Sequence, residues 1–116
     1  MPHMCDATLL RVFIGEGQRY GKHTLFEAIV LKARELNLAG ATVLRGPLGF
    51  GHSSYLHTSK ILRLSFDLPV VIEIVDEEKK INRLLPELDR MMTSGLVTLE
   101  NVKMRCSDPK NQSATS

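Results

Sequence analysis

Tryptophan is absent from this 116-residue sequence, and aromatic residues make up only 5% of it. Sheet proteins that bind single-stranded RNA stack the bases on several aromatic side chains. The segment expected to form the third strand, residues 68–75, has no aromatic residue, and Phe13 alone cannot supply such a platform. The net charge of +2 is also too small to indicate nucleic acid. We therefore expect no direct contact with nucleic acid.

Cysteine is scarce, and long apolar runs are absent. The sequence has only Cys5 and Cys106, too few for a disulfide framework. The first and last strands could bring them close, but cytosolic thiols stay reduced, so we expect two free thiols. No apolar run approaches the roughly 20 residues of a membrane span, and the N-terminus lacks a signal-peptide profile. These absences predict a cytoplasmic protein that is not inserted in a membrane.

The pattern of apolar residues predicts four strands, over residues 8–15, 41–45, 68–75 and 96–104. The third is the strongest strand signal because it is short, β-branched and almost wholly apolar. Residues 16–23 are expected to form a connecting loop. Residues 1–106 are expected to form a single domain, and residues 107–116 a polar tail.

Two helices are predicted between these strands. Thr24 is expected to cap the first, with Glu27 completing a capping box, and Gly40 is expected to end it. Asp76 is expected to cap the second. Pro86 conflicts with a helix interior, so we expect a kink or a restart of the helix there.

The element order predicts an α+β, ferredoxin-like βαββαβ fold: a four-stranded antiparallel sheet with both helices on one face. The first and third strands are then central neighbours. Their side chains on the other face make it too apolar to remain in water, which favours an interface there. Arg11 and Glu73 are expected to pair across that face. The residues expected on it are Leu9, Arg11, Phe13, Val71, Glu73 and Val75.

The stretch after the second strand is rich in glycine and free of acid. No carboxylate occurs between Glu35 and Asp67, whereas three basic side chains do, which gives a positive potential suited to phosphate or carboxylate groups. Arg45 is the best candidate for a bidentate anion contact. Glycines can bring backbone N–H groups close to a ligand, and those concerned are Gly46, Gly49 and Gly51.

Three stretches carry a resemblance to a known family: "GATVLRGPLGFGH" (40–52), "SFDLPVVIEIVDEEKKI" (65–81) and "LVTLENVKMR" (96–105). The sequence resembles the PII signal-transduction superfamily, and more closely its bacterial and archaeal PII-like branch of unassigned role. The resemblance covers roughly residues 9–105. It implies a cytoplasmic homotrimer of ferredoxin-like subunits whose sheets face the trimer axis. It also implies a regulatory protein and not an enzyme.

The same resemblance implies adenine-nucleotide binding in clefts between subunits, and a long loop after the second strand that contacts a target enzyme or transporter. The ligand-binding residues expected on this basis are Arg45, Gly46, Gly49, Gly51, Ser94 and Gly95. The partner-contacting residues expected in the loop are His52, Tyr55, His57, Lys60 and Arg63.

The sequence departs from the superfamily before the fourth strand. There "MMTSGLV" (91–97) replaces a basic, glycine-rich loop and contains no lysine or arginine. A smaller anion or a mononucleotide is therefore as plausible a ligand as ATP.

An alternative function is a small metal- or histidine-dependent enzyme that uses the same cleft, with raw material from His52, Ser53, Ser54 and His57. No recognised catalytic motif joins these residues, and the histidine spacing is not a known ligand spacing. We expect no metal and no cofactor.

Overall fold

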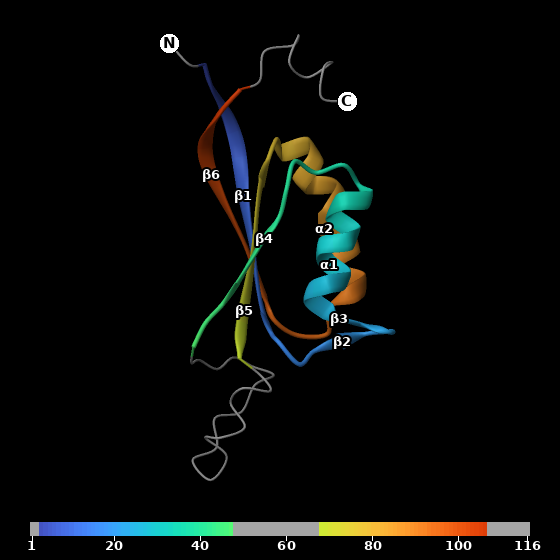
Figure 1. Cartoon of the computed structure of the whole chain (residues 1–116). Helices are drawn as coiled ribbons and strands as arrows, with labels where there is room; N and C mark the ends of the chain where they lie inside the picture. Colours follow the sequence, from blue (N-terminus) through green and yellow to red (C-terminus); the bar gives the residue numbers. More distant parts are fainter. Residues whose placement is uncertain (1–2, 48–67, 107–116) are drawn as a thin grey trace.

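A computed structural model describes residues 3–47 and 68–106 of the chain. One four-stranded antiparallel sheet has the strand order β4-β5-β1-β6, and both helices lie on the same side of it (Figure 1). This confirms the predicted α+β, ferredoxin-like fold. The bounds are β1 Met4–Gly15, β2 Arg19–Tyr20, β3 His23–Thr24, α1 Leu25–Glu35, β4 Thr42–Arg45, β5 Pro69–Asp76, α2 Glu78–Met91 and β6 Leu96–Arg105.

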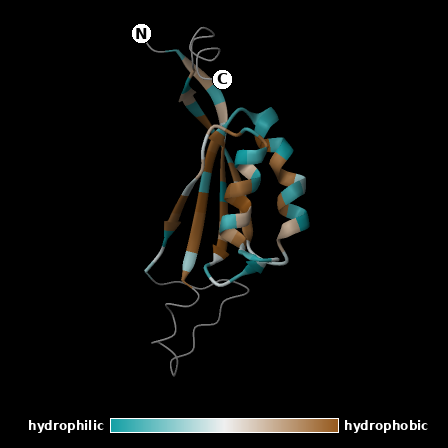
Figure 2. Ribbon diagram, turned by 45° about the vertical axis from the view of Figure 1, so that its right-hand side comes forward, coloured by the Kyte–Doolittle hydropathy of each residue, from teal (hydrophilic) through white to brown (hydrophobic). Residues whose placement is uncertain are grey.

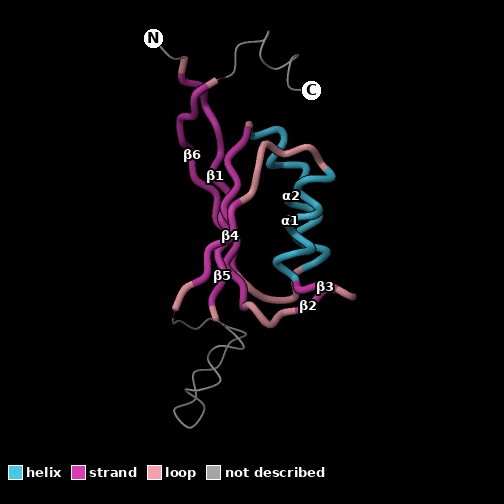
Figure 3. Tube along the Cα trace, in the orientation of Figure 1, coloured by secondary structure: helices cyan, strands magenta, loops and turns pink. Residues whose placement is uncertain are grey.

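The segment between β1 and α1 is more ordered than a plain loop. Strands β2 and β3 form a short antiparallel hairpin, drawn beside the ends of the helices in Figure 3, with Tyr20 opposite His23. Gly21 at its tip has a φ of +60°, a conformation that glycine adopts at little cost. The expectation of an unstructured connection over residues 16–23 is therefore wrong in its central part.

Helix α1 begins with the predicted capping box. The Thr24 side chain accepts a hydrogen bond from the Glu27 backbone N–H, and the Glu27 side chain accepts from the Thr24 backbone. The helix ends earlier than expected, because Asn37 takes a φ of 62° and begins the reversal. The N–H of Leu38 donates to Ala33 O at 3.0 Å, which closes the end of the helix. Gly40 therefore does not end α1.

Asp76 belongs to the end of β5 and is not the N-cap of α2. That position is held by Glu77, whose side chain makes no capping hydrogen bond. Asp76 is 3% exposed. Its carboxylate accepts from the N–H of Ala39 at 2.8 Å and from that of Glu77 at 2.7 Å. A buried carboxylate needs such partners, so Asp76 ties the α1–β4 connection to the third strand of the main sheet.

Helix α2 continues through Pro86 from Glu78 to Met91. The expectation that the helix restarts at Pro86 is therefore wrong. A proline within a helix removes one backbone hydrogen bond, and Pro86 lies on the exposed side of the helix. The apolar side of α2 remains continuous in the core.

The core lies between the helices and one face of the sheet. Figure 2 shows hydrophobic colour on the strands and on parts of both helices, and hydrophilic colour on much of the remaining helix surface. Alternation along the strands places every second side chain on this face. The largest fully buried side chains are Leu10, Val12, Leu25, Ile29, Val70, Ile72, Ile74, Ile81, Leu84 and Leu88.

Among residues 3–47 and 68–106, no helix lies over the opposite face of the sheet (Figure 1). The register sets Leu9 against Val75, Arg11 against Glu73 and Phe13 against Val71, as predicted. By the same alternation the face extends onto both edge strands. We call these residues the open face: Leu9, Arg11, Phe13, Thr42, Leu44, Val71, Glu73, Val75, Leu96, Thr98 and Glu100.

Arg11 forms the polar centre of the open face. Its Nε lies 2.9 Å from Glu73 Oε2, which confirms the predicted pair, and its Nη1 lies 3.2 Å from Glu100 Oε1. The hydrogen bond to Glu73 raises the pKa of Arg11 above its ordinary value. Large apolar side chains nearby remain in solvent, namely Leu44, Val75 and Leu96.

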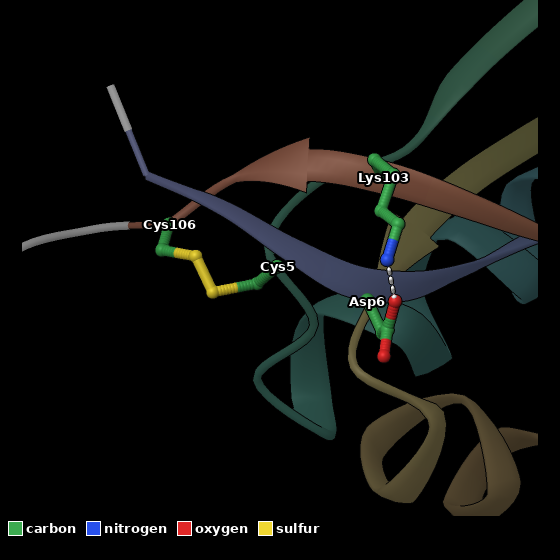
Figure 4. Close-up of a disulfide and its surroundings, with 4 residues drawn as sticks. All are labelled: Cys5, Asp6, Lys103 and Cys106. Carbon is green, nitrogen blue, oxygen red and sulfur yellow. Dashed lines mark hydrogen bonds and ion pairs between the residues drawn. A yellow bond between two sulfur atoms is a disulfide. The ribbon is translucent and has the colours of Figure 1, made fainter. Parts of the chain in front are cut away.

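The two cysteines lie close together where the start of β1 meets the end of β6. Met4 pairs with Arg105, which brings the start of β1 beside the end of β6. A disulfide joins Cys5 to Cys106, whose Cα atoms are 5.5 Å apart (Figure 4). The expectation of two free thiols is wrong because this strand pairing places both residues within disulfide reach. Lys103 and Asp6 form an ion pair next to the bond.

Candidate functional site

The predicted ligand-binding residues in the described part of the chain gather at one end of the sheet. Arg45 ends β4 and pairs with Val70 of β5, which in turn pairs with Ile14 near the end of β1. Ser94 and Gly95 lie just before β6 at the same end. The strand order makes β4 one edge of the sheet and β6 the other.

Arg45 lies on the helix side of the sheet, away from the open face. Its guanidinium carbon is 5.9 Å from the centre of the Phe26 ring on α1. Its Nε is 2.7 Å from Oε2 of Glu16, which follows β1. The Arg45 side chain is nevertheless 59% exposed. The expected anion donor is thus accessible, and it already holds a carboxylate of its own chain.

Gly46 makes a backbone contact that bears on its predicted role. Its N–H donates to Pro69 O at 2.8 Å and so extends the β4–β5 ladder by one bond. A ligand that uses this donor would have to replace the bond to Pro69. The other predicted residues of this stretch lie outside the described residues: Gly49, Gly51, His52, Tyr55, His57, Lys60 and Arg63.

The turn before β6 borders a pocket of about 220 Å³. Ser94 Oγ lies 3.3 Å from Nε2 of Gln18, which donates to it. Gly95 has a φ of +117°, and a Cβ at this position would lie 2.8 Å from the carbonyl oxygen of Phe13. Glycine is therefore required for the close approach of this turn to β1. The pocket is lined by Leu88, Asp89, Met92, Thr93, Ser94 and Gly95.

The turn 15–18 connects both groups of residues, and sequence reasoning missed it. Gln18 Oε1 accepts from the N–H of Gly15 at 2.7 Å, which closes the turn. Glu16 reaches Arg45 at one edge of the sheet, and Gln18 reaches Ser94 at the other. The available signal was two glycines that flank an acidic residue directly after a strand, in "IGEGQ" (14–18).

Arg45 and Gly95 belong to opposite edges of the four-stranded sheet, so three strand spacings, about 14 Å in total, separate the backbones of β4 and β6. The same two groups of residues would also face each other where the β4 edge of one copy lies beside the β6 edge of another. We call the surroundings of Arg45 and those of Ser94 and Gly95 the two candidate half-sites.

A second pocket of about 290 Å³ lies at the other end of the sheet and contains none of the predicted residues. Its lining is Asp6, Ala7, Thr8, Glu78, Asn101 and Val102. Over residues 3–47 and 68–106, no three or more His, Cys, Asp or Glu residues gather as metal ligands would. In the same part of the chain, no helix is long and apolar enough to cross a membrane.

In the described residues, these features define a small ferredoxin-like protein with helices on one face of its sheet. Residues 7–104 match the model of the DUF190 family, described as "Uncharacterized ACR, COG1993", and the chain belongs to this family. It is 38% identical over 96 residues to a UPF0166 protein of Aquifex aeolicus, covering 83% of this chain and 90% of that one. It is 34% identical over 97 residues to the UPF0166 protein MJ1524 of Methanocaldococcus jannaschii, covering 83% and 89%.

Solved structures place the fold among PII-like proteins, which confirms the predicted resemblance. CPII of Thiomonas intermedia K12, bound to ADP and bicarbonate, matches with a TM-score of 0.61 and 18% identity over 91% of this chain and 95% of that one. The GlnK–ATP complex of B. subtilis matches with a TM-score of 0.51 and 11% identity, over 84% of this chain and 82% of that one. At these identities the likeness concerns the fold.

Proposed function

We propose that this protein is a PII-like regulatory protein and not an enzyme. In this proposal it is a cytoplasmic homotrimer that senses a small anionic ligand, an adenine nucleotide being the first candidate. The Cys5–Cys106 disulfide is a feature that argues against this location, because cytosolic thiols are kept reduced. It acts on a target enzyme or transporter through the loop after β4, which carries His52, Tyr55, His57, Lys60 and Arg63. The observation that carries the proposal is the placement of Arg45 and Ser94 at the same end, but on opposite edges, of the sheet.

The two edges favour a ring of copies. When a β4 edge repeatedly meets a β6 edge, the contact is head-to-tail, and such contacts close into a ring if the rotation fits. The open face would then turn toward the axis of the ring and bury its apolar side chains, as large exposed apolar patches favour. Arg11 is compatible with burial there, because Glu73 and Glu100 already pair with it within the chain.

The ligand class follows from Arg45 and from similar structures. The Arg45 guanidinium is exposed at the half-site and suits phosphate or carboxylate groups. CPII, whose fold is similar, is bound to ADP and bicarbonate. The turn 92–95 offers the two hydroxyls of Thr93 and Ser94 and backbone groups but no basic side chain, which favours modest affinity for the phosphates.

Calorimetry with ADP, AMP and bicarbonate tests the proposal. Arg45→Ala should lose about ten- to hundredfold in affinity, the value of a charge-assisted hydrogen bond. Arg90→Ala is the matched control: Arg90 is 64% exposed and lies 2.7 Å from Glu87, much as Arg45 is 59% exposed and lies 2.7 Å from Glu16. Equal affinities for wild type and Arg45→Ala would place the site elsewhere. A monomer at micromolar concentration in sedimentation would contradict the trimer.

A further inference from the structure

Glu16 holds a position that the proposed ligand would need. Its Oε2 lies 2.7 Å from Arg45 Nε, and its side chain is only 22% exposed. Its backbone is fixed as well, because the Glu16 N–H donates to Leu68 O at 2.8 Å and so joins the end of β1 to the start of β5. The carboxylate is therefore presented to Arg45 from an anchored turn and not from a free loop.

The contact determines which part of the arginine remains available. A guanidinium offers a side-on pair of donors that includes Nε, and an end-on pair formed by its two terminal nitrogens. Glu16 contacts Nε and so obstructs the side-on pair, while the guanidinium carbon lies over the Phe26 ring, 5.9 Å from its centre. The charges of Glu16 and Arg45 also cancel. An approaching anion thus meets a neutralised cation with a carboxylate next to it.

We propose that Glu16 acts as an internal competitor for the ligand at Arg45. Its carboxylate takes the place of the ligand's anionic group in the empty protein, and a phosphate-bearing ligand binds Arg45 by displacing it. This inference rests on the proposed function, because it assigns a regulator to the same half-site. It adds a residue that sets the affinity threshold, since a ligand must outcompete a carboxylate that is always present.

The change in ligand affinity on removing the Glu16 charge distinguishes a competitor from a residue that supports binding. If Glu16 competes with the ligand, removing its charge must tighten binding, because the ligand no longer displaces an ion pair and no longer meets a like charge. If Glu16 instead holds Arg45 in the right place for the ligand, removing its charge must weaken binding. The two roles therefore predict opposite changes in the same measured constant.

The experiment is a titration of the full chain with ADP, for wild type, Glu16→Gln and Glu87→Gln. Glu87 is the matched control, because it is 20% exposed and lies 2.7 Å from Arg90, compared with 22% and 2.7 Å for Glu16. Glu16→Gln should bind ADP about two- to fivefold more tightly, the range expected for release of a partly exposed ion pair. Glu87→Gln should bind as wild type does.

The possible outcomes distinguish a failure of the competitor role of Glu16 from a failure of the proposed function. If ADP binds wild type and Arg45→Ala weakens that binding, but neither Glu16→Gln nor Glu16→Ala binds ADP more tightly than wild type, the competitor role is refuted and the proposed function stands. If wild type, Glu16→Gln and Glu16→Ala all fail to bind ADP, AMP and bicarbonate, the proposed function and this inference are refuted together. Glu16→Ala also removes the charge, so it should tighten ADP binding even if glutamine keeps a hydrogen bond to Arg45.

Discussion

Removing the disulfide should cost this protein a large share of its stability. Cys5 and Cys106 are separated by 101 positions, so the bond closes a loop through almost the whole chain. In the chain-entropy model, a loop of about 100 residues restricts the unfolded state by about 4.7 kcal/mol. Domains of this size are stable by only about 5–15 kcal/mol in total. The pairing of β1 with β6 holds the two residues near each other in the folded state, so the effect acts mainly through the unfolded chain.

Urea and thermal unfolding of the oxidised protein, the reduced protein and a Cys5→Ser/Cys106→Ser variant measure this cost. The reduced protein and the double variant should agree, with a melting temperature lower than that of the oxidised form by on the order of 20 °C. A change in the free energy of unfolding below about 1 kcal/mol would refute the estimate. In that case amide exchange should show faster opening only at the strand ends near Met4 and Arg105, where the bond lies.

Four further substitutions test the open face, the cap of α1 and the turn before β6. Arg11→Ala leaves Glu73 and Glu100 unpaired on the open face and should dissociate the proposed trimer in sedimentation, whereas Arg11→Leu with Glu73→Leu and Glu100→Leu should retain it; an intact trimer in the first variant would argue against this interface. Thr24→Ala should lower the free energy of unfolding by about 1 kcal/mol in urea, and an unchanged midpoint would contradict the capping role. Hydrogen bonds from Thr24 hold the pKa of Glu27 below its ordinary 4.5. The contribution of Glu27 to the free energy of unfolding is therefore complete above pH 4.5 and is lost as the pH falls through the lowered pKa. Glu27→Gln should flatten the acid part of the stability profile, and an unaltered profile would exclude Glu27 as the source of that slope. Gly95→Ala should cost about 1–3 kcal/mol, because φ is +117° and a backbone oxygen lies 2.8 Å from the added Cβ; unfolding at the wild-type urea concentration would disprove the strain.

The fold was predictable because its signals are local and periodic. Alternation in the central strands decides which side chains share a face, and antiparallel pairing of neighbours then brings Arg11 opposite Glu73. The capping box of α1 is also a local signal, since Thr24 and Glu27 are three residues apart. Each of these predictions needed only spacing along the chain and one assumption about strand order.

The wrong predictions of helix ends concern residue types that occur in more than one kind of local structure. An aspartate after a strand fits a helix cap, yet Asp76 remains in β5 because its carboxylate bonds the N–H of Ala39, which is 37 positions away. Asparagine adopts positive φ at a helix end more readily than most residues other than glycine, and Asn37 with a φ of 62° ends α1 before Gly40 is reached. These choices depend on tertiary partners, which spacing in the sequence does not reveal.

In the predicted site, too, the sequence indicated a residue but not its partner in the folded chain. Arg45 was found from composition, because it lies in an acid-free stretch, but its partner Glu16 lies 29 positions earlier in a segment expected to be a connecting loop. That segment became informative only when the sheet placed the end of β1 between the β4 and β6 edges. Since the turn 15–18 contacts Arg45 through Glu16 and Ser94 through Gln18, a substitution in it can alter both of the proposed half-sites at once. Variants at Glu16 and Gln18 must therefore be compared with Arg45→Ala in the same titration, so that a change at one edge is not attributed to the other.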